Sequence, residues 1–300
     1  MQKLNIKIMR VIESSELIIN PDGSVFHLHL KPEQLADKVI LVGDPGRVDT
    51  VARFFDTQEL SVSNREFKTV TGTFKGKRIT VLSTGIGTDN IDIVVNELDA
   101  LVNIDLKTRT EKTEKKKLTL VRLGTSGALQ PEIDLGSFVM TEISIGFDGL
   151  LNFYANRNRV SDLEMEEAFL KHTSWNPLCA KPYFCKSSQR LVELFSDFTI
   201  PGVTISAPGF YGPQGRVLRL PLADPQLNDK IVDFNYKGRK ITNFEMESSA
   251  INGLSLLLGH DAITICTIIA NRVIKDATKD YKPYINSLIE KTLDKLSTLE

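Results

Sequence analysis

The sequence predicts an α/β sandwich built around a mixed β-sheet. Short runs rich in β-branched residues alternate with amphipathic helical runs, and glycine marks the ends of several of the β-rich runs. The chain has 300 residues, of which 41% are hydrophobic and 25% charged, so a sizeable core is available. Because ligands of α/β sheets bind outside the strand ends, the glycine-rich strand ends are where a site is expected.

Two strand-to-helix units are predicted early in the chain. The strand at 39–42 runs into a glycine turn in which Asp44 is suited to cap a helix and Pro45 to occupy its first position. The strand at 79–82 passes through the glycine-containing segment 84–87 into a stretch with apolar residues at helical spacing. In both units a helix is expected to begin directly after a glycine-containing turn that follows a strand.

A third unit of this kind is expected where a strand at 118–123 meets the glycine-containing segment 124–127. The rest of the chain contains further candidate strands and helices, which the spacing of their apolar residues indicates. These are strands at 138–140, 203–205 and 263–269 and helices at 246–258 and 281–298.

A charged segment at 107–117 interrupts the alternation. It mixes lysine with threonine and glutamate, which is typical of a solvated loop or a helix end. A nucleic-acid patch is the alternative, but the interleaved glutamates and the absence of aromatic residues disfavour it. There is neither an internal repeat nor a linker, so residues 1–300 are expected to form one domain that carries this segment as an insertion.

Charge and composition exclude several classes of partner. The 37 basic and 38 acidic side chains give a net charge of -1, which provides no general attraction for nucleic acid or an anionic membrane. The sequence has no apolar run of bilayer length and no signal peptide, so we expect a cytoplasmic protein. Cys179, Cys185 and Cys266 are an odd number without Cys-x-x-Cys spacing, which suggests neither disulfides nor a zinc site.

Two carboxylates, Glu245 and Glu247, stand just ahead of the apolar run at 250–258. A carboxylate at the edge of a core must be paired or must bind something, and the adjacent hydroxyls of a sugar diol match one well. The alternative is that both acids lie in the first turn of a helix, where the helix dipole favours them. This segment alone does not decide between the two.

Three arginines lie beside glycine turns or strand ends. Arg47 follows the turn at 43–46, Arg65 lies in the segment 63–67, and Arg122 precedes Gly124. Guanidinium forks match phosphate oxygens two at a time, and helix amino termini add backbone N–H donors to the same anion. Each arginine alone is consistent with an ordinary ion pair, but the coincidence of three favours a phosphate pocket.

The segment 207–216 combines an aromatic pair with glycine and proline, followed by an amide and a guanidinium. Such a loop is able to stack a planar ring on Phe210 while Gln214 and Arg216 reach the polar edge of the ring. A neutral turn with incidental polar residues is the alternative reading.

Other signals are weaker. The segment 124–128 resembles a nucleophile elbow, but Ala128 stands where the closing glycine belongs. His27 and His29 are expected on one face of a strand, yet no metal-type spacing accompanies them, so a surface or ligand-contact role is preferred and no metal site is expected.

Five segments together resemble the nucleoside phosphorylase superfamily, and within it the uridine-cleaving branch most. They are 43–47, 64–67, 83–87, 122–128 and 243–248, in that order, and the resemblance extends over about 25–272. It implies a three-layer α/β/α sandwich whose central mixed sheet is partly barrel-like. It also implies reversible phosphorolysis of uridine to uracil and ribose 1-phosphate.

The resemblance also implies roles for single residues. Gly43, Arg47, Arg122 and Thr125 are expected to hold phosphate together with Arg65 of a neighbouring subunit; His27, Thr125, Met246 and Glu247 to contact ribose; and Phe210, Gln214 and Arg216 to hold uracil. Of these, Arg122, Glu247, Gln214 and Arg216 are the expected catalytic residues. Asn271 stands where the purine-cleaving branch carries an aspartate that acts as general acid.

The implied enzyme uses inorganic phosphate as a co-substrate and needs no metal or organic cofactor. It is expected to be a homodimer with shared active sites, and further assembly of dimers into a hexamer is left open. Asn90 replaces a serine that lies near a monovalent-cation site in related bacterial enzymes, which makes potassium binding doubtful, and Gly212-Pro213 reverses the family order. A phosphorylase or nucleosidase for another nucleoside, and a non-catalytic nucleoside sensor, are the alternatives.

Overall fold

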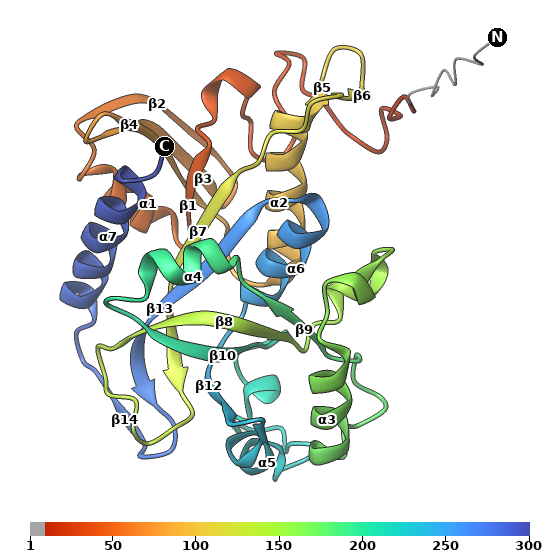
Figure 1. Cartoon of the computed structure of the whole chain (residues 1–300), viewed down its shortest axis with the longest axis vertical. Helices are drawn as coiled ribbons and strands as arrows, with labels where there is room; N and C mark the ends of the chain where they lie inside the picture. The colour runs from red at the N-terminus through yellow and green to blue at the C-terminus, as the bar shows by residue number, and fades with distance from the viewer. Residues whose placement is uncertain (1–9) are drawn as a thin grey trace.

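The structure is a computed structural model that describes residues 10–300 (Figure 1). Five strands close into a barrel at its centre. The parallel pair β7 (Thr119–Ala128) and β13 (Asp261–Asn271) is followed by β8 (Phe138–Gly146), β10 (Ile200–Ser206) and β12 (Arg239–Glu245). Antiparallel pairing of β12 with β7 completes the ring.

An open wing of four strands extends the barrel from β7. Its order is β1 (Lys38–Val42), β4 (Lys77–Ser83), β3 (Phe67–Phe74) and β2 (Thr57–Asn64). β1 runs parallel to both β7 and β4, whereas β2, β3 and β4 are antiparallel neighbours. The wing and the barrel therefore form one continuous mixed sheet.

Helices cover the two faces of this sheet in separate apolar clusters. On one face α2 (Thr88–Asn103) packs against α6 (Ser248–Leu258). On the other lie α1 (Pro45–Ala52), α4 (Gln189–Phe195) and α7 (Lys282–Ser297). A third cluster beside β10 and β12 includes α3 (Leu163–Thr173) and α5 (Leu227–Asp233). The predicted fold class, a three-layer sandwich with a partly barrel-like sheet, is confirmed.

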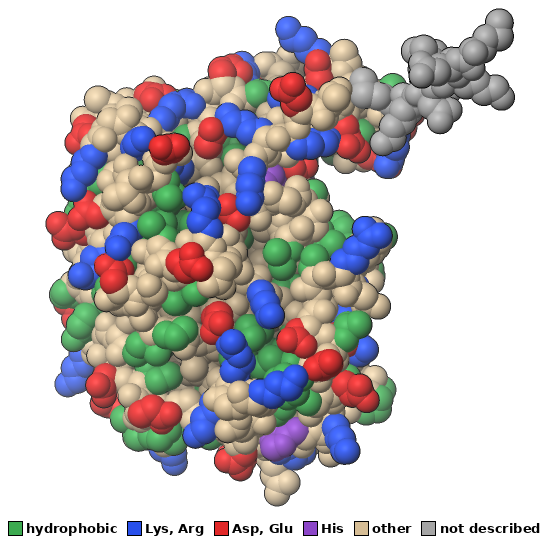
Figure 2. All heavy atoms as spheres, viewed as in Figure 1, with side chains coloured by type: hydrophobic (Ala, Val, Ile, Leu, Met, Phe, Trp, Pro, Cys, Tyr) green, Lys and Arg blue, Asp and Glu red, His purple; other side chains and the backbone are tan. Residues whose placement is uncertain are grey.

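Short elements complete the chain. The strands are β5 (Ile104–Asp105), β6 (Thr110–Glu111), β9 (Tyr183–Lys186), β11 (Asn235–Tyr236) and β14 (Asp276–Ala277), and the 3₁₀ helices are Pro32–Gln34, Leu150–Phe153, Arg157–Arg159 and Gly212–Gln214. Within residues 10–300 no helix is both long and apolar enough to cross a membrane. On the face shown in Figure 2, basic and acidic side chains are interspersed.

Most predicted elements are present, but two expectations are wrong. The segment 124–127 is not a turn before a helix: β7 continues through it to Ala128, because β13 and β12 pair with it on both sides. His27 and His29 do not share a strand face, since residues 26–28 form a turn and His29 has a φ of 53°. The segment 107–117 is a mostly exposed loop that contains β6.

Candidate active site

Parallel register brings three glycine-containing segments to one edge of the sheet. Val42, the last residue of β1, pairs with Ser83 at the end of β4 and with Leu123 in β7. The chain leaves β1 through Gly43 and leaves β4 toward Gly85, and a side chain on Gly43 would lie 3.5 Å from the Gly85 carbonyl oxygen. The segments 43–47, 84–87 and 122–125 therefore lie together at one edge of the sheet.

Arg47 lies in the first turn of α1 and faces this edge. The Asp44 carboxylate caps the helix by accepting a hydrogen bond from the Gly46 N–H at 2.9 Å, with Pro45 in the first position as predicted. Arg47 donates only a long hydrogen bond, 3.4 Å, to the Leu123 carbonyl, and it forms no ion pair with a carboxylate of residues 10–300. Burial, and then the charge of Arg122, lowers the pKa of Arg47. An anion beside Arg47 would supply the missing partner.

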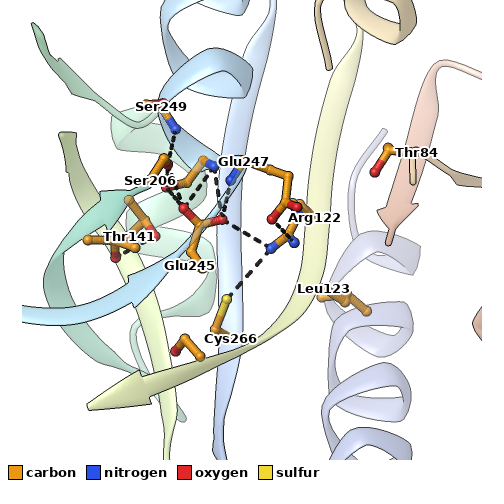
Figure 3. A network of polar contacts seen from close by, with 12 residues as sticks. Thr84, Arg122, Leu123, Thr141, Ser206, Glu245, Glu247, Ser249 and Cys266 are labelled. Atoms are coloured by element: carbon orange, nitrogen blue, oxygen red, sulfur yellow. Dashed lines mark hydrogen bonds and ion pairs between the residues drawn. The ribbon is translucent and has the colours of Figure 1, made fainter. Parts of the chain in front are cut away.

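Arg122 is buried in the middle of β7 between two carboxylates (Figure 3). Its Nη2 donates a short hydrogen bond to Glu247, and its Nη1 lies 3.3 Å from an oxygen of Glu245 and 3.7 Å from the Cys266 sulfur. Burial opposes the charge, but Glu247 and Glu245 outweigh it and raise the pKa of Arg122, so the guanidinium stays charged. The Nε of Arg122 has no hydrogen-bond partner among the described residues.

Glu245 is fully occupied by the protein. It is the last residue of β12, and its carboxylate accepts hydrogen bonds from the hydroxyls of Ser206 and Ser248 at 2.5 and 2.7 Å. The backbone N–H groups of Glu247 and Ser248 also donate to it at 2.9 Å. These donors are the free amino-terminal groups of α6, so Glu245 caps that helix and at the same time orients Arg122.

Glu247 is the N-cap residue of α6, and its carboxylate contacts Gly87 and Arg122. One oxygen accepts from the Gly87 N–H at 2.9 Å and the other from Arg122. Burial raises the pKa of Glu247, the Arg122 charge opposes this, and Glu245 adds to it. Glu245 is therefore held by the protein, whereas Glu247 stands beside Arg122 and Gly87. The contact of Glu247 with a ribose stays a prediction.

The other predicted residues of this region lie close by in the chain. Thr125 is partly exposed three residues beyond Arg122 in β7, and its hydroxyl forms no hydrogen bond with the described residues. Met246 is partly exposed between the two glutamates. Among residues 10–300 no group of three or more His, Cys, Asp or Glu side chains is arranged to hold a metal ion.

The loop at 207–216 brings Phe210, Gln214 and Arg216 together. Arg216 lies over the Phe210 ring, 3.7 Å from guanidinium carbon to ring centroid, and donates to the Phe210 carbonyl at 2.5 Å. The same Nη1 donates to the Gln214 Oε1 at 2.6 Å, and Gln214 is only 3% exposed. The ring that was expected to stack a planar ligand is thus covered by a guanidinium on one face and remains half exposed.

Arg272, just beyond β13, is a candidate that the sequence argument did not select. Its guanidinium lies over the Phe244 ring at 5.2 Å, and its Nη1 is buried without a hydrogen-bond partner among the described residues. Burial, and then the nearby charge of Arg216, lowers the pKa of Arg272 to about 10. The sequence offered only one signal for Arg272, namely that this basic residue comes directly after a long apolar strand.

The Asn271 side chain, in contrast, forms hydrogen bonds with backbone groups. Its amide donates to the carbonyls of Gln130 and Ile133 at 3.0 Å each, and its oxygen accepts from the N–H groups of Val273 and Ile274. It therefore fixes the loop after β7 and the turn after β13, and this turn carries Arg272.

His27 lies away from this cluster, whereas Arg65 adjoins its edge, because the carbonyl of the next residue, Glu66, accepts from the Ser83 hydroxyl at 2.6 Å. The His27 Nδ1 contacts Glu97 of α2 at 2.6 Å, and Asn64 donates to the His27 carbonyl at 2.8 Å, which places the adjacent Arg65 near the same surface. Glu97 is ten residues beyond Gly87, so it lies about 15 Å farther along α2. Arg65 is exposed and forms no hydrogen bond or ion pair with the described residues.

The chain is similar to known proteins in family, in sequence and in structure. A family model of the phosphorylase superfamily matches residues 37–295. The uridine phosphorylase of Thermococcus kodakarensis is 30% identical over 268 residues, which are 89% of this chain and 84% of that protein. The uridine phosphorylase of Escherichia coli is 29% identical over 261 residues, with 83% and 87% covered. The solved Trypanosoma brucei nucleoside phosphorylase, described as showing uridine phosphorylase activity, has a TM-score of 0.86 at 29% identity and covers 94% of this chain and 100% of that one. The chain belongs to the phosphorylase superfamily.

Proposed function

We propose that this protein is a uridine phosphorylase, which converts uridine and inorganic phosphate reversibly to uracil and ribose 1-phosphate. The observation that carries the proposal is the buried contact between Arg122 and Glu247, next to the unpaired Arg47. A cation able to bind an anion and a carboxylate able to bind a diol, side by side, are what attack of phosphate on a ribose requires. The uridine phosphorylases among the relatives support the choice of substrate.

Phosphate binds between Arg47 and Arg122, with Gly43 and the Thr125 hydroxyl as further contacts and Arg65 supplied by a second copy of the chain. Burial, and then the charge of Arg122, lowers the pKa of Arg47, so a bound phosphate would stabilise the charged guanidinium. The amino terminus of α1 adds a favourable dipole for the phosphate charge. No organic cofactor or metal is needed, because phosphate itself is the nucleophile.

Ribose binds through Glu247, whose carboxylate accepts from the 2′- and 3′-hydroxyls once phosphate competes for Arg122. Met246 covers the sugar, Thr125 contacts it beside the phosphate, and His27 of a second copy reaches the 5′-hydroxyl. Glu97 holds the His27 ring at 2.6 Å and accepts from its backbone N–H at 3.0 Å, so the imidazole is oriented before substrate arrives.

Uracil binds against Phe210, with Gln214 and Arg216 at its polar edge and the free Nη1 of Arg272 as a third donor. A phosphate oxygen attacks C1′, the C1′–N1 bond breaks, and the bonding electrons leave with uracil, which then takes up a proton. Positive charge that develops on the ribose is stabilised by the phosphate, and negative charge on uracil by Gln214 and the arginines. Fixing phosphate below C1′ removes much of the entropic barrier.

Release of uracil from uridine, followed by absorbance, tests the proposal directly. We expect release only when phosphate is present, together with formation of ribose 1-phosphate. Equal release without phosphate would identify a hydrolase, and faster turnover of inosine than of uridine would overturn the base assignment. Saturable uridine binding without any product would identify a sensor.

A further inference from the structure

A cavity of about 430 Å³ lies beside the uracil loop but outside the proposed active site. Its lining includes Phe147, Trp175, Leu222 and Leu227, together with Pro213 of the uracil loop. None of the residues proposed to hold phosphate, ribose or uracil lines it. The volume falls within the range of about 300 to 1,000 Å³ that is typical of small-molecule sites.

The lining carries two carboxylates and no cationic side chain. Asp224 is already paired with Lys230, whose Nζ lies 2.8 Å away. Asp148 has only neutral partners: the Leu150 N–H at 2.8 Å and the hydroxyls of Tyr183 and Ser249 at 2.9 Å each. Burial raises the pKa of Asp148, as expected for a carboxylate that lacks a cation.

Aromatic side chains stand next to this carboxylate. The Phe147 and Trp175 rings are 4.7 Å apart between centroids, with a tilt of 58° between their planes. Their faces and edges suit a flat ring, and their π-electrons attract positive charge. A cationic aromatic ligand would therefore satisfy both features of the lining at once.

We propose that this cavity is a second small-molecule site, which binds a flat aromatic cation of the arylalkylamine or aryl amidine class with its charge on Asp148. The cavity is also lined by Gly212 and Gly215, which flank Gln214 in the chain. A bound ligand therefore contacts the same loop that carries the uracil-binding amide. The ligand recognised here is chemically unlike either substrate, since uridine and phosphate carry no positive charge.

Phenethylamine is a suitable probe, and Trp175 reports on it because it is the single tryptophan of the chain. Titration into the wild-type protein should change the tryptophan emission saturably, with a dissociation constant of about 1 mM for so small a ligand. The neutral analogue 2-phenylethanol should bind at least about tenfold more weakly, because it lacks the charge-assisted hydrogen bond. Equal affinity for the amine and the alcohol would overturn the proposal.

Single substitutions show which of the two carboxylates that line the cavity binds the amine. Asp148→Asn should weaken phenethylamine binding by about tenfold or more, whereas the matched control Asp224→Asn should leave it nearly unchanged. The opposite order of effects would overturn the assignment of the charge to Asp148. Displacement of the amine by uridine with phosphate in simple competition would place the ligand in the active site and overturn the proposal.

A measurement on the wild-type chain remains decisive if Asp148→Asn fails to fold. Cys179 lines the cavity and is exposed, whereas Cys185 and Cys266 are buried. Saturating phenethylamine should slow modification of Cys179 by a thiol reagent severalfold, and 2-phenylethanol at the same concentration should not. An unchanged rate with the amine would overturn the proposal.

Discussion

Two neighbouring glutamates in one chain segment have different roles because of the backbone between them. Glu245 ends β12 and points at the amino-terminal N–H groups of α6, whereas Glu247 lies in the turn and reaches Gly87. Both face Arg122, so one guanidinium serves two buried carboxylates. The net negative charge of this trio makes the site sensitive to any loss of Arg122.

Arg122→Lys should lower kcat/KM for uridine phosphorolysis by about 100-fold to 1,000-fold while the fold is retained. Lysine keeps the positive charge between the carboxylates but lacks the planar fork that contacts Glu247 and Glu245 together. Arg122→Ala should in addition destabilise the protein by about 3 to 5 kcal/mol, because two buried carboxylates lose their cation. Steady-state kinetics and thermal unfolding measure the two effects, with Arg53→Lys on the exposed end of α1 as the control. Full activity of Arg122→Lys would contradict the assigned role.

The activity should fall at low pH through Glu247. Only the ionised carboxylate accepts from both ribose hydroxyls, and burial raises its pKa above the usual 4.5. Binding of uridine is therefore complete above this raised pKa and is lost as the pH falls through it, at a higher pH than for an ordinary glutamate. The profile of kcat/KM against pH measures this loss.

Glu247→Gln serves as the control for that profile. It should lower the activity at every pH and remove the acid limb that belongs to the carboxylate, while the titration of phosphate itself remains. An unchanged acid limb in this variant would show that another group is responsible.

At the scale of elements, β7 positions Arg122 because Gly124 leaves room for its guanidinium. A Cβ on Gly124 would overlap the Arg122 Nη1 and lie 3.1 Å from the Cys266 sulfur. Gly124→Ala should displace the guanidinium and lower kcat/KM by about 100-fold, as expected for a misplacement of about 1 Å. Lys186→Ala, at an exposed position of β9, is the control for both kinetics and thermal unfolding. Equal activity of the two variants would contradict this role of β7.

The start of α2 carries the prediction about monovalent cations. The Asn90 Nδ2 donates to the Ile86 carbonyl at 3.4 Å, so this side chain presents an amide N–H₂ there. We expect the same phosphorolysis rate in potassium, sodium and tetramethylammonium buffers of equal ionic strength. Clear stimulation by potassium alone would contradict this expectation.

Helices and strands whose apolar residues recur at a regular spacing could be predicted from the sequence. Those without such a spacing could not. The strand at 39–42 and the capped helix at Pro45 were found because burial and capping leave local signals. β2 was missed because half of its residues face solvent and its apolar positions are few, with only Leu60 and Val62 against the core. The length of β7 was underestimated because its pairing with β12 is non-local, so glycine was read as a turn.

Candidate site residues could be selected where one residue type suits one ligand group. Arg47 stood out because its guanidinium matches phosphate, and the pair Glu245 and Glu247 because a carboxylate matches a diol. The division of roles between Glu245 and Glu247 depends on the angle between β12 and α6, which no local pattern encodes. Arg272 was missed for the same reason, since its proximity to Arg216 is a property of the tertiary fold.

The whole molecule is incomplete as an enzyme if His27 and Arg65 belong to its site. His27 contacts Glu97, about 15 Å along α2 from the Gly87 N–H that holds Glu247. Arg65 precedes Glu66, whose carbonyl accepts from the Ser83 hydroxyl at 2.6 Å. Asn64 links the two segments by its hydrogen bond to the His27 carbonyl. One exposed surface thus presents an imidazole and a guanidinium together, as a symmetric dimer with two shared sites requires.

Mixed dimers test this sharing. Arg65→Ala and Glu247→Ala chains should each be nearly inactive alone, but co-expression with two affinity tags should restore about one quarter of the wild-type activity. Half of randomly formed dimers are mixed, and each of these contains one intact site and one doubly altered site. Co-expression of Arg122→Lys with Glu247→Ala is the matched control, because both residues serve the site of their own chain and no intact site forms. No activity in purified mixed dimers of Arg65→Ala with Glu247→Ala would show that each chain builds its site alone. Restored activity in the control would contradict the placement of Arg122 and Glu247 of one chain in the same site.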